Sequence, residues 1–298
     1  MKAFKFLSNT AIVFSLVLLA SCSSDDDQEE TGYKKQKLEF KAVIESNDAT
    51  RATLESDYSV SWDDYDGISV FCDNNEASVE FGITPSSENA SIATFSNYGE
   101  VLPFWFDPNQ FYYALYPHAS ATFNVSTKSI TSVMPTNQTV SSGRTHDKKA
   151  LFMAACADMD ERIFNFKNIP ALIKVTISNN AAGKVKFIEI ESKNTANILS
   201  GNFEVTPVYY ANTQMTIRSI SGADKKHTVK LRIPEGEEAQ DFYLAVLPGR
   251  VDGLTLKFEG DSGVLVQHES NKAVEFKRSK IYDFGSYDIE KETTPEVK

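Results

Sequence analysis

The sequence predicts an all-β protein with two tandem antiparallel β-sandwich domains of the Greek-key type. Apolar and polar residues alternate over short runs, which is the pattern of strands with one buried face. Gly, Pro, Asn, Asp and Ser separate these runs, and no stretch beyond the N-terminal segment has a convincing helical spacing. The clearest runs are LEFKAVIE (38–45), GISVF (67–71), FYYALYP (111–117), ALIKVTI (171–177), VKFIEIES (185–192), HTVKLRIP (227–234), FYLAVLP (242–248), LTLKFE (254–259) and GVLVQHE (263–269).

The first residues have the pattern of an export signal. Lys2 and Lys5 precede AIVFSLVLLA (11–20), an apolar run of signal-peptide length that is too short to span a bilayer as a helix. The run leads into LASC, which resembles the bacterial lipobox and ends in Cys22. We therefore expect residues 1–21 to be a lipoprotein signal peptide and Cys22 to carry the lipid. An ordinary secretory signal cut nearby is the alternative.

An acidic segment follows Cys22. SSDDDQEE cannot bury apolar surface, so residues 22–36 are predicted to form a solvated tether. The segment also resembles the acidic stretch after the lipidated cysteine in surface-displayed lipoproteins of Bacteroides-type bacteria. This resemblance implies a surface-exposed position on the outer membrane, reached through the lipid anchor. A plain spacer explains the composition equally well.

A repeated heptapeptide suggests how the rest of the chain divides. FYYALYP and FYLAVLP both end in Pro, which fits a strand end where no ladder donor is needed. A division near DMDE (158–161) gives each half one copy and an alternating strand at its start. We therefore expect an N-terminal sandwich at 37–160 and a C-terminal sandwich at 161–298. Convergence of aromatic-rich strands is the alternative to duplication.

Charge and cysteine content restrict the partners. The chain has a formal net charge of −11; without Lys2 and Lys5, its 30 basic side chains fall to 28 against 41 acidic ones, a net charge of −13. Such a chain is repelled by phosphate backbones, so nucleic acid is not an expected partner. Besides Cys22, only Cys72 and Cys156 are present. They are able to pair in an oxidising compartment, and two buried free thiols are the other possibility.

The motifs that suggest chemistry have simpler explanations as turns. GDSG (260–263) resembles the nucleophile motif of trypsin-like proteases, but it lies between two alternating strands and is predicted to be a hairpin turn. WDDYDG (62–67) begins like a calcium loop, with Asp64, Asp66 and Gly67, but Ile68 and Asn75 occupy ligand positions of that loop. The four histidines lack zinc spacing. We therefore expect no enzyme activity, no metal and no cofactor.

Trp105 has two possible roles. PFWFDP (103–108) places Trp105 among aromatics and prolines, as in a sugar-stacking or adhesive platform. Large aromatics in β-proteins more often fill the core. We therefore predict core positions for Trp62 and Trp105.

Several segments, in their order along the chain, resemble those of fimbrillin-like proteins, the pilus subunits of Bacteroides-type bacteria. WDDYDGISVF (62–71) is similar to the W-x(3)-D-x-I-x-V-F segment, and FYYALYP to the aromatic-Ala-Tyr-Pro strand, of that family. LFMAA (151–155), FYLAVLPG and FKRSKIYDFG (276–285) are similar to later segments. FNFKNIPALIKVTI (164–177) lacks the histidine that the family has there.

This resemblance implies transthyretin-like sandwiches, export as a lipoprotein and assembly into a fimbrium. In that family, an arginine-specific protease cuts a loop after the first strand, the strand is lost, and a neighbouring subunit supplies a donor strand. Here the first strand is LEFKAVIE, and the loop SNDATRAT after it contains Arg51 followed by Ala52. We therefore expect processing between Arg51 and Ala52, with a loop arginine of no special role as the alternative.

The displaced strand is expected to face the core with Leu38, Phe40, Ala42 and Ile44. Burial of its three large apolar side chains is worth roughly 5–9 kcal/mol as an upper bound. After IYDFGSYDI (281–289), EKETTPEVK has no alternating apolar pattern, so we expect a tip or accessory subunit. The expected partners are other fimbrial subunits and a host or bacterial surface ligand. The alternative is a surface lipoprotein that does not polymerise and binds a glycan or host ligand through sandwich loops.

Overall fold

The structure is a computed structural model that describes residues 38–44, 62–85, 91–97, 110–140, 145–179, 184–208, 216–219, 226–234 and 240–290. All of them belong to one compact unit, residues 33–298. Within these residues, no helix is long and apolar enough to cross a membrane. The expected signal peptide (1–21) and tether (22–36) lie outside the described part of the chain.

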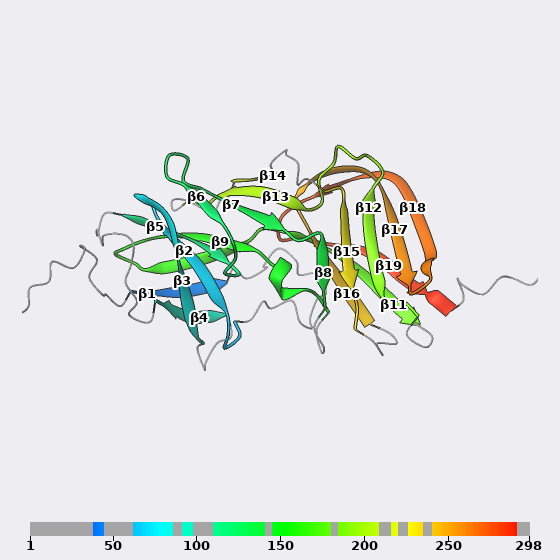
Figure 1. The fold of residues 1–298 in the computed structure, drawn as a ribbon, viewed down its shortest axis with the longest axis horizontal. Coiled ribbons are helices and arrows are strands. Elements are labelled where there is room, and N and C mark those ends of the chain that lie inside the picture. Colours follow the sequence, from blue (N-terminus) through cyan, green and yellow to red (C-terminus); the bar gives the residue numbers. More distant parts are fainter. Residues whose placement is uncertain are drawn as a thin grey trace, which may run out of the picture. The chain divides into compact units, whose positions relative to one another are not determined.

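The described chain is all-β, as predicted, and its strands form four sheets (Figure 1). A closed barrel contains β1 (Glu39–Ile44), β2 (Gly67–Cys72), β3 (Asn75–Pro85), β4 (Ile92–Ser96), β5 (Phe111–Tyr116), β9 (Met153–Asp158) and β10 (Ile163–Asn168). A four-stranded sheet contains β6 (Thr122–Asn124), β7 (Ser129–Met134), β13 (Gly201–Thr206) and β14 (Thr216–Ser219). A three-stranded sheet contains β11 (Ala171–Asn179), β16 (Gln240–Val246) and β19 (Ile281–Asp288). A five-stranded sheet contains β8 (Asn137–Thr139), β12 (Phe187–Ser192), β15 (Thr228–Arg232), β17 (Gly249–Gly260) and β18 (Gly263–Phe276), and a short 3-10 helix, η1, covers Lys148–Ala150.

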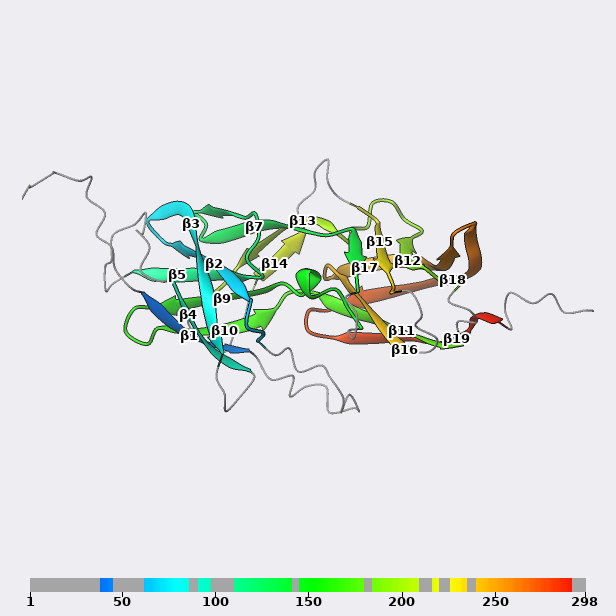
Figure 2. The same cartoon turned by 60° about the horizontal axis from the view of Figure 1, so that its bottom comes forward.

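The expected plan of two antiparallel sandwiches is met only in part. The N-terminal strands close into a barrel, and three strand pairs are parallel: β1 with β10, β11 with β19, and β8 with β15. The barrel closes because β1 forms hydrogen bonds along both of its edges, to β4 and to β10 (Figure 2). Alternation of apolar residues predicts which face of a strand is buried, but not which strands are neighbours.

The sheets also cross the expected division between residues 160 and 161. β10 lies after it and completes the barrel, whereas β7 lies before it and pairs with β13. β8 likewise precedes the division and extends the sheet of β15. The division into 37–160 and 161–298 therefore stays a prediction about domains, while hydrogen-bonded sheets join the two ranges.

The barrel has an aromatic core. Trp62, at the entry to β2, is 5% exposed, and its ring contacts those of Phe95, Tyr116 and Phe166 at centroid distances of 5.0, 5.3 and 5.5 Å. Its indole N–H donates to the carbonyl of Ser91 at 3.2 Å. A buried tryptophan needs such a partner for its polar edge, and the prediction of a core position for Trp62 is confirmed.

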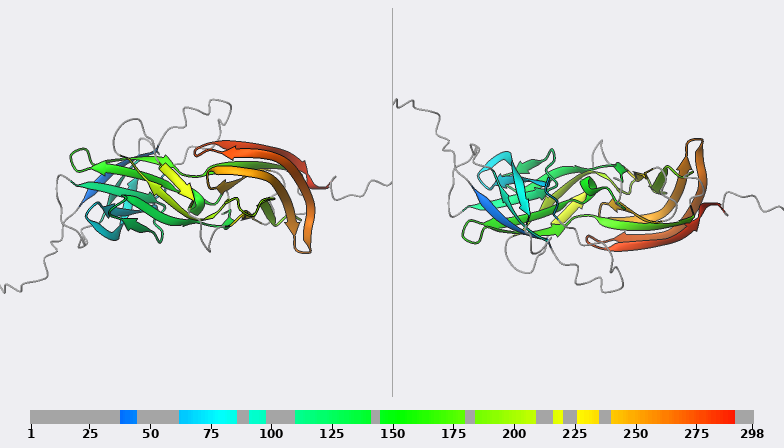
Figure 3. Two further views of the ribbon diagram at one scale, coloured as in Figure 1. Left: turned by 90° about the horizontal axis from the view of Figure 1, so that it is seen from above. Right: turned by 90° about the horizontal axis from the view of Figure 1, so that it is seen from below.

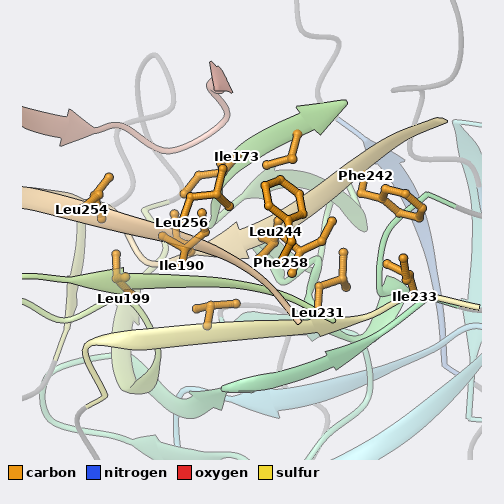
Figure 4. Packing of buried hydrophobic residues seen from close by; sticks show 14 of the residues in the cluster. Ile173, Ile190, Leu199, Leu231, Ile233, Phe242, Leu244, Leu254, Leu256 and Phe258 are labelled. Carbon is orange, nitrogen blue, oxygen red and sulfur yellow. The ribbon is translucent and has the colours of Figure 1, made fainter. Parts of the chain in front are cut away.

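A second core lies between the three-stranded and the five-stranded sheet. Figure 4 shows its side chains pointing toward one another, with Ile173 and Leu244 from the first sheet and Ile190, Leu256 and Phe258 from the second. β12 alternates between buried and more exposed positions along its whole length, and β17 does so in part, as a sheet with one solvated face requires. β16 is instead buried at every position from Phe242 to Val246, because its other face packs against further apolar residues.

A third apolar cluster joins the barrel to the other sheets, and it shows that the two heptapeptides are not equivalent. Both copies are buried strands that end just before a proline, as predicted. However, Ala114 of the first copy lies in the barrel core, whereas its counterpart Ala245 lies in the third cluster. Tyr113 lies in the third cluster, whereas its counterpart Leu244 lies in the second core. Equivalent positions of the two heptapeptides therefore lie on opposite faces of their strands. A position that faces the core of its own half in one copy faces away from that core in the other, as it would if one strand were shifted by one residue.

The longest strands, β17 and β18, form a bent hairpin beside β19 (Figure 3). Its register shifts between Asp252 and Leu254 and again between Phe258 and Glu259, and such irregularities bend a hairpin and increase its twist. On the other side of β17, Lys257 pairs with Glu189 and Glu191 of β12 at 3.0 and 2.5 Å. The hydrogen bond from Lys257 lowers the pKa of the Glu191 carboxyl.

Candidate functional site: the first strand of the barrel

β1 is the strand that closes the barrel. It runs antiparallel to β4 and parallel to β10, so both of its edges are paired. On the edge toward β10, Lys41 N–H donates to the carbonyl of Arg162 at 2.9 Å, and on the edge toward β4, Ile44 N–H donates to that of Ser91 at 3.1 Å. Removal of β1 would therefore leave two facing strand edges without their partner.

A buried asparagine anchors the start of this strand. Leu38 N–H donates to Oδ1 of Asn97 at 2.9 Å, and Asn97 N–H donates to the carbonyl of Leu38 at 3.4 Å. Asn97 is 1% exposed, which is unusual for this residue type. The sequence does not identify Asn97 as an anchor, because an asparagine at the end of a strand normally indicates a solvent-exposed turn.

The inward face of β1 is the one expected from its alternation. Leu38, Phe40 and Ala42 have no exposed surface, and Ile44 is 6% exposed. The intervening Glu39 and Lys41 are exposed. β1 therefore belongs to the barrel core through every second residue.

Phe40 makes the largest contribution to this face. Its ring stacks on that of Phe164 with a centroid distance of 4.4 Å and an interplanar angle of 26°. The rings of Tyr112 and Phe81 lie 5.2 and 6.0 Å away. Phe40 thus contacts aromatic side chains from β10, β5 and β3, on several sides of the barrel.

The expected processing and lipid sites lie outside the described residues. This applies to Cys22, to Arg51 and Ala52, and also to Trp105. β1 ends at Ile44, and the next described residue is Trp62, so Arg51 lies in the connection between β1 and β2.

In the turn before β2, a lysine lies between two carboxylates. Asp66 N–H donates to the carbonyl of Asp63 at 3.0 Å, and Asp63 N–H donates to Oδ2 of Asp66 at 2.8 Å. Nζ of Lys148, in η1, lies 2.5 Å from Oδ2 of Asp63 and 2.9 Å from Oδ2 of Asp66. The Tyr116 hydroxyl donates to the other oxygen of Asp66 at 3.1 Å. The ammonium group therefore supplies the positive charge between the two carboxylates.

The GDSG sequence forms the predicted hairpin turn. Gly260 of β17 pairs with Gly263 of β18, and Asp261 and Ser262 are the exposed turn residues between them. Across the described part of the chain, no group of three or more His, Cys, Asp and Glu side chains is arranged to bind a metal ion.

Cys72 and Cys156 are free thiols on opposite faces of the barrel wall. Cys72 pairs across the strands with Tyr112 and belongs to the barrel core, whereas Cys156 pairs with Tyr113 and packs against the third cluster. Adjacent residues of β5 point to opposite faces, so the two sulfurs are separated by the sheet. Burial raises the pKa of the Cys72 thiol to about 11 and that of Cys156 to about 12.

Comparisons with known proteins find similar chains among the solved structures. No family model matches the chain. No curated protein matches its sequence either. One similar structure is a "putative cell adhesion protein" from Bacteroides uniformis, with 17% identity and a TM-score of 0.47 over 85% of this chain and 94% of that one. Another of the same description, from Bacteroides ovatus, has 13% identity and a TM-score of 0.47 over 85% and 93%. The tip fimbrial protein Mfa3 from Porphyromonas gingivalis has 9% identity and a TM-score of 0.31 over 78% and 80%.

The chain is thus an all-β protein in which the first strand completes a closed barrel.

Proposed function

We propose that this protein is an adhesive subunit of a surface fimbrium, and that it assembles by strand addition at the position of β1. The observation that carries the proposal is that β1 alone joins β4 to β10 and fills the barrel core with Phe40. A cut between Arg51 and Ala52 would separate β1 from the rest of the barrel while leaving β2 intact. Loss of β1 would then open an apolar groove flanked by two unpaired strand edges, which is a template for an added strand.

The groove sets requirements for the incoming strand. It needs apolar residues at every second position, and a large side chain where Phe40 stacks on Phe164. A neighbouring fimbrial subunit is the proposed donor. β19 of this chain already pairs with β11 in its own sheet, and so we place the protein at the tip or in an accessory position.

The test begins with the mature chain and an arginine-specific protease. We expect a cut after Arg51, read by mass spectrometry of the product that begins at Ala52, and no cut there in the Arg51→Lys variant. The cut protein should capture a synthetic LEFKAVIE peptide, and a peptide with Glu in place of Phe40 should not bind. An intact bond at Arg51, or a cut product that captures no peptide and stays monomeric with partner subunits present, would refute the assembly proposal.

The position in the cell has its own test. We propose that Cys22 carries a lipid that anchors the exported chain in the outer membrane, because two or more acyl chains make a stable anchor. Cys22→Ala should move the protein from the membrane fraction to the soluble fraction. Immunogold labelling should find the native chain at the ends of surface fibres; labelling along their whole length would show a stalk subunit.

A further inference from the structure

A hollow beside the turn before β2 has the features of a ligand site. Its volume is about 850 Å³, and its walls come from the turn, from β3, from the segment after β5, from β8 and from η1. Pockets of roughly 300–1,000 Å³ are typical of small-ligand sites. The mechanism of strand addition does not use this hollow, since β1 does not contribute to its lining.

Tyr65 is one of the residues that line this hollow, and 99% of its surface is exposed. Large aromatic side chains are usually buried at least in part, and tyrosine is enriched among the residues that carry most of the energy in binding interfaces. The side chain has only two rotatable angles, so binding against its ring costs little conformational entropy.

The position of Tyr65 is determined by its neighbours in the turn. Asp63 and Asp66, on either side of it, both pair with Lys148, and the backbone of the turn forms its own hydrogen bond. Asp147 connects the opposite wall, because its carboxylate accepts from the N–H groups of Thr139 in β8 and of Lys149 in η1 at 2.8 and 2.9 Å. The two walls are therefore linked by ion pairs and hydrogen bonds before any ligand arrives, which lowers the cost of binding.

The remaining lining offers hydrogen-bonding groups of both kinds. Glu80 provides carboxylate acceptors, and Asn137 provides an amide with a donor and an acceptor. The His118 imidazole lies between Oγ of Ser69, at 2.9 Å from Nδ1, and Glu80, at 3.6 Å from Nε2. Vicinal hydroxyl groups, which both donate and accept, fit such a lining.

We propose that this hollow binds a neutral sugar residue of a glycan, with the sugar stacked on Tyr65. The negative face of the aromatic ring attracts the polarised C–H groups on one face of a pyranose. The acidic residues Asp66, Glu80 and Asp147 outnumber the lysines of the lining, and the whole chain is acidic, so a polyanionic ligand is disfavoured. This inference goes beyond assembly, because it assigns a ligand to a part of the barrel that strand addition leaves unchanged.

Saturation-transfer NMR on the soluble mature chain (residues 23–298) tests the proposal. The experiment needs no fimbrial partner. The probes are glucose, galactose, mannose, fucose and N-acetylglucosamine, each at tens of millimolar, with N-acetylneuraminic acid as the anionic probe. We expect at least one neutral sugar to receive saturation and the anionic sugar to receive none. Tyr65→Ala should weaken the binding by about tenfold or more, while Tyr65→Phe, which keeps the ring, should retain it.

The matched control is Val264→Ala, which truncates another exposed apolar side chain, on β18, and should leave sugar binding unchanged. Thermal unfolding of each variant verifies that it is folded; Tyr65 is exposed, so its substitution should not alter the melting temperature. The proposal is overturned if no neutral sugar binds, if binding is unchanged in Tyr65→Ala, or if only the anionic sugar binds. It is also overturned if Tyr65→Ala abolishes self-association of the chain and affects no sugar, because the site is then a protein contact.

Discussion

Phe40 is the residue through which the first strand is most firmly joined to the barrel. We expect Phe40→Ala to lower the free energy of unfolding by about 3–5 kcal/mol, because the ring is fully buried and stacks on Phe164. Urea denaturation followed by tryptophan fluorescence measures this change. Lys41→Ala, on the exposed face of the same strand, should change it by no more than about 0.5 kcal/mol. Equal effects of the two substitutions would contradict the assigned orientation of β1.

Because burial raises the pKa of both thiols, we expect the free energy of unfolding to fall in alkaline solution. Both are protonated in the folded and the unfolded chain below pH 9, and above it the unfolded thiols ionise while Cys72 stays protonated to about pH 11 and Cys156 to about pH 12. The unfolded state then binds fewer protons, so the free energy of unfolding falls with rising pH, by about 1.4 kcal/mol per pH unit for each thiol.

Denaturant titrations at pH 8, 9 and 10 measure this fall, and the Cys72→Ala, Cys156→Ala double variant should show a shallower one. The same burial predicts that thiol reagents modify the soluble mature chain (residues 23–298) slowly at neutral pH and rapidly after unfolding. Fast modification of both thiols in the folded protein would contradict their placement.

At the scale of elements, the β17–β18 hairpin depends on a close approach of two backbones. A Cβ atom added at Gly260 would lie 2.6 Å from the carbonyl oxygen of Lys184, a distance that real Cβ atoms essentially never show. We therefore expect Gly260→Ala to lower the melting temperature through a loss of about 1–3 kcal/mol. Ser262→Ala, in the exposed turn of the same hairpin, should have little effect on stability. An unchanged melting temperature in the Gly260→Ala variant would show that the backbones at Gly260 and Lys184 can move apart without loss of stability.

The positions of the strands are the feature of this fold that the sequence predicts best. Each of the alternating runs, from LEFKAVIE to GVLVQHE, overlaps a strand of the structure, because a period of two and separating turn residues are local properties. Which of those strands pair with one another is harder to predict from the sequence. The parallel pairs of β1 with β10 and of β11 with β19 join segments distant in the sequence, and nothing within either strand specifies its partner.

The whole molecule is predicted to unfold as one unit despite its two halves. The third cluster combines Tyr113 and Leu115 of the barrel wall with Ala245 and Leu247 from the other half, so loss of one part exposes apolar surface of the other. Leu244→Ala, in the second core, should destabilise the protein by about 2–5 kcal/mol. The unfolding midpoint measured by tryptophan fluorescence, to which Trp62 of the barrel contributes, should shift. The midpoint measured by far-UV circular dichroism should shift by the same amount. A shift in only one of the two probes would show independent halves.

The sequence alone determined the all-β class, the inward face of β1, the turn at GDSG and the core position of Trp62. Each of these follows from residue types at short spacing. The tertiary structure decided that β1 closes a barrel, that Asn97 anchors it, and that Lys148 pairs with both Asp63 and Asp66 beside Tyr65. It also decided that Cys72 and Cys156 lie on opposite faces of a sheet and that the two heptapeptides face in opposite directions. These features depend on which distant segments become neighbours, and that choice is made by the packing of the whole chain.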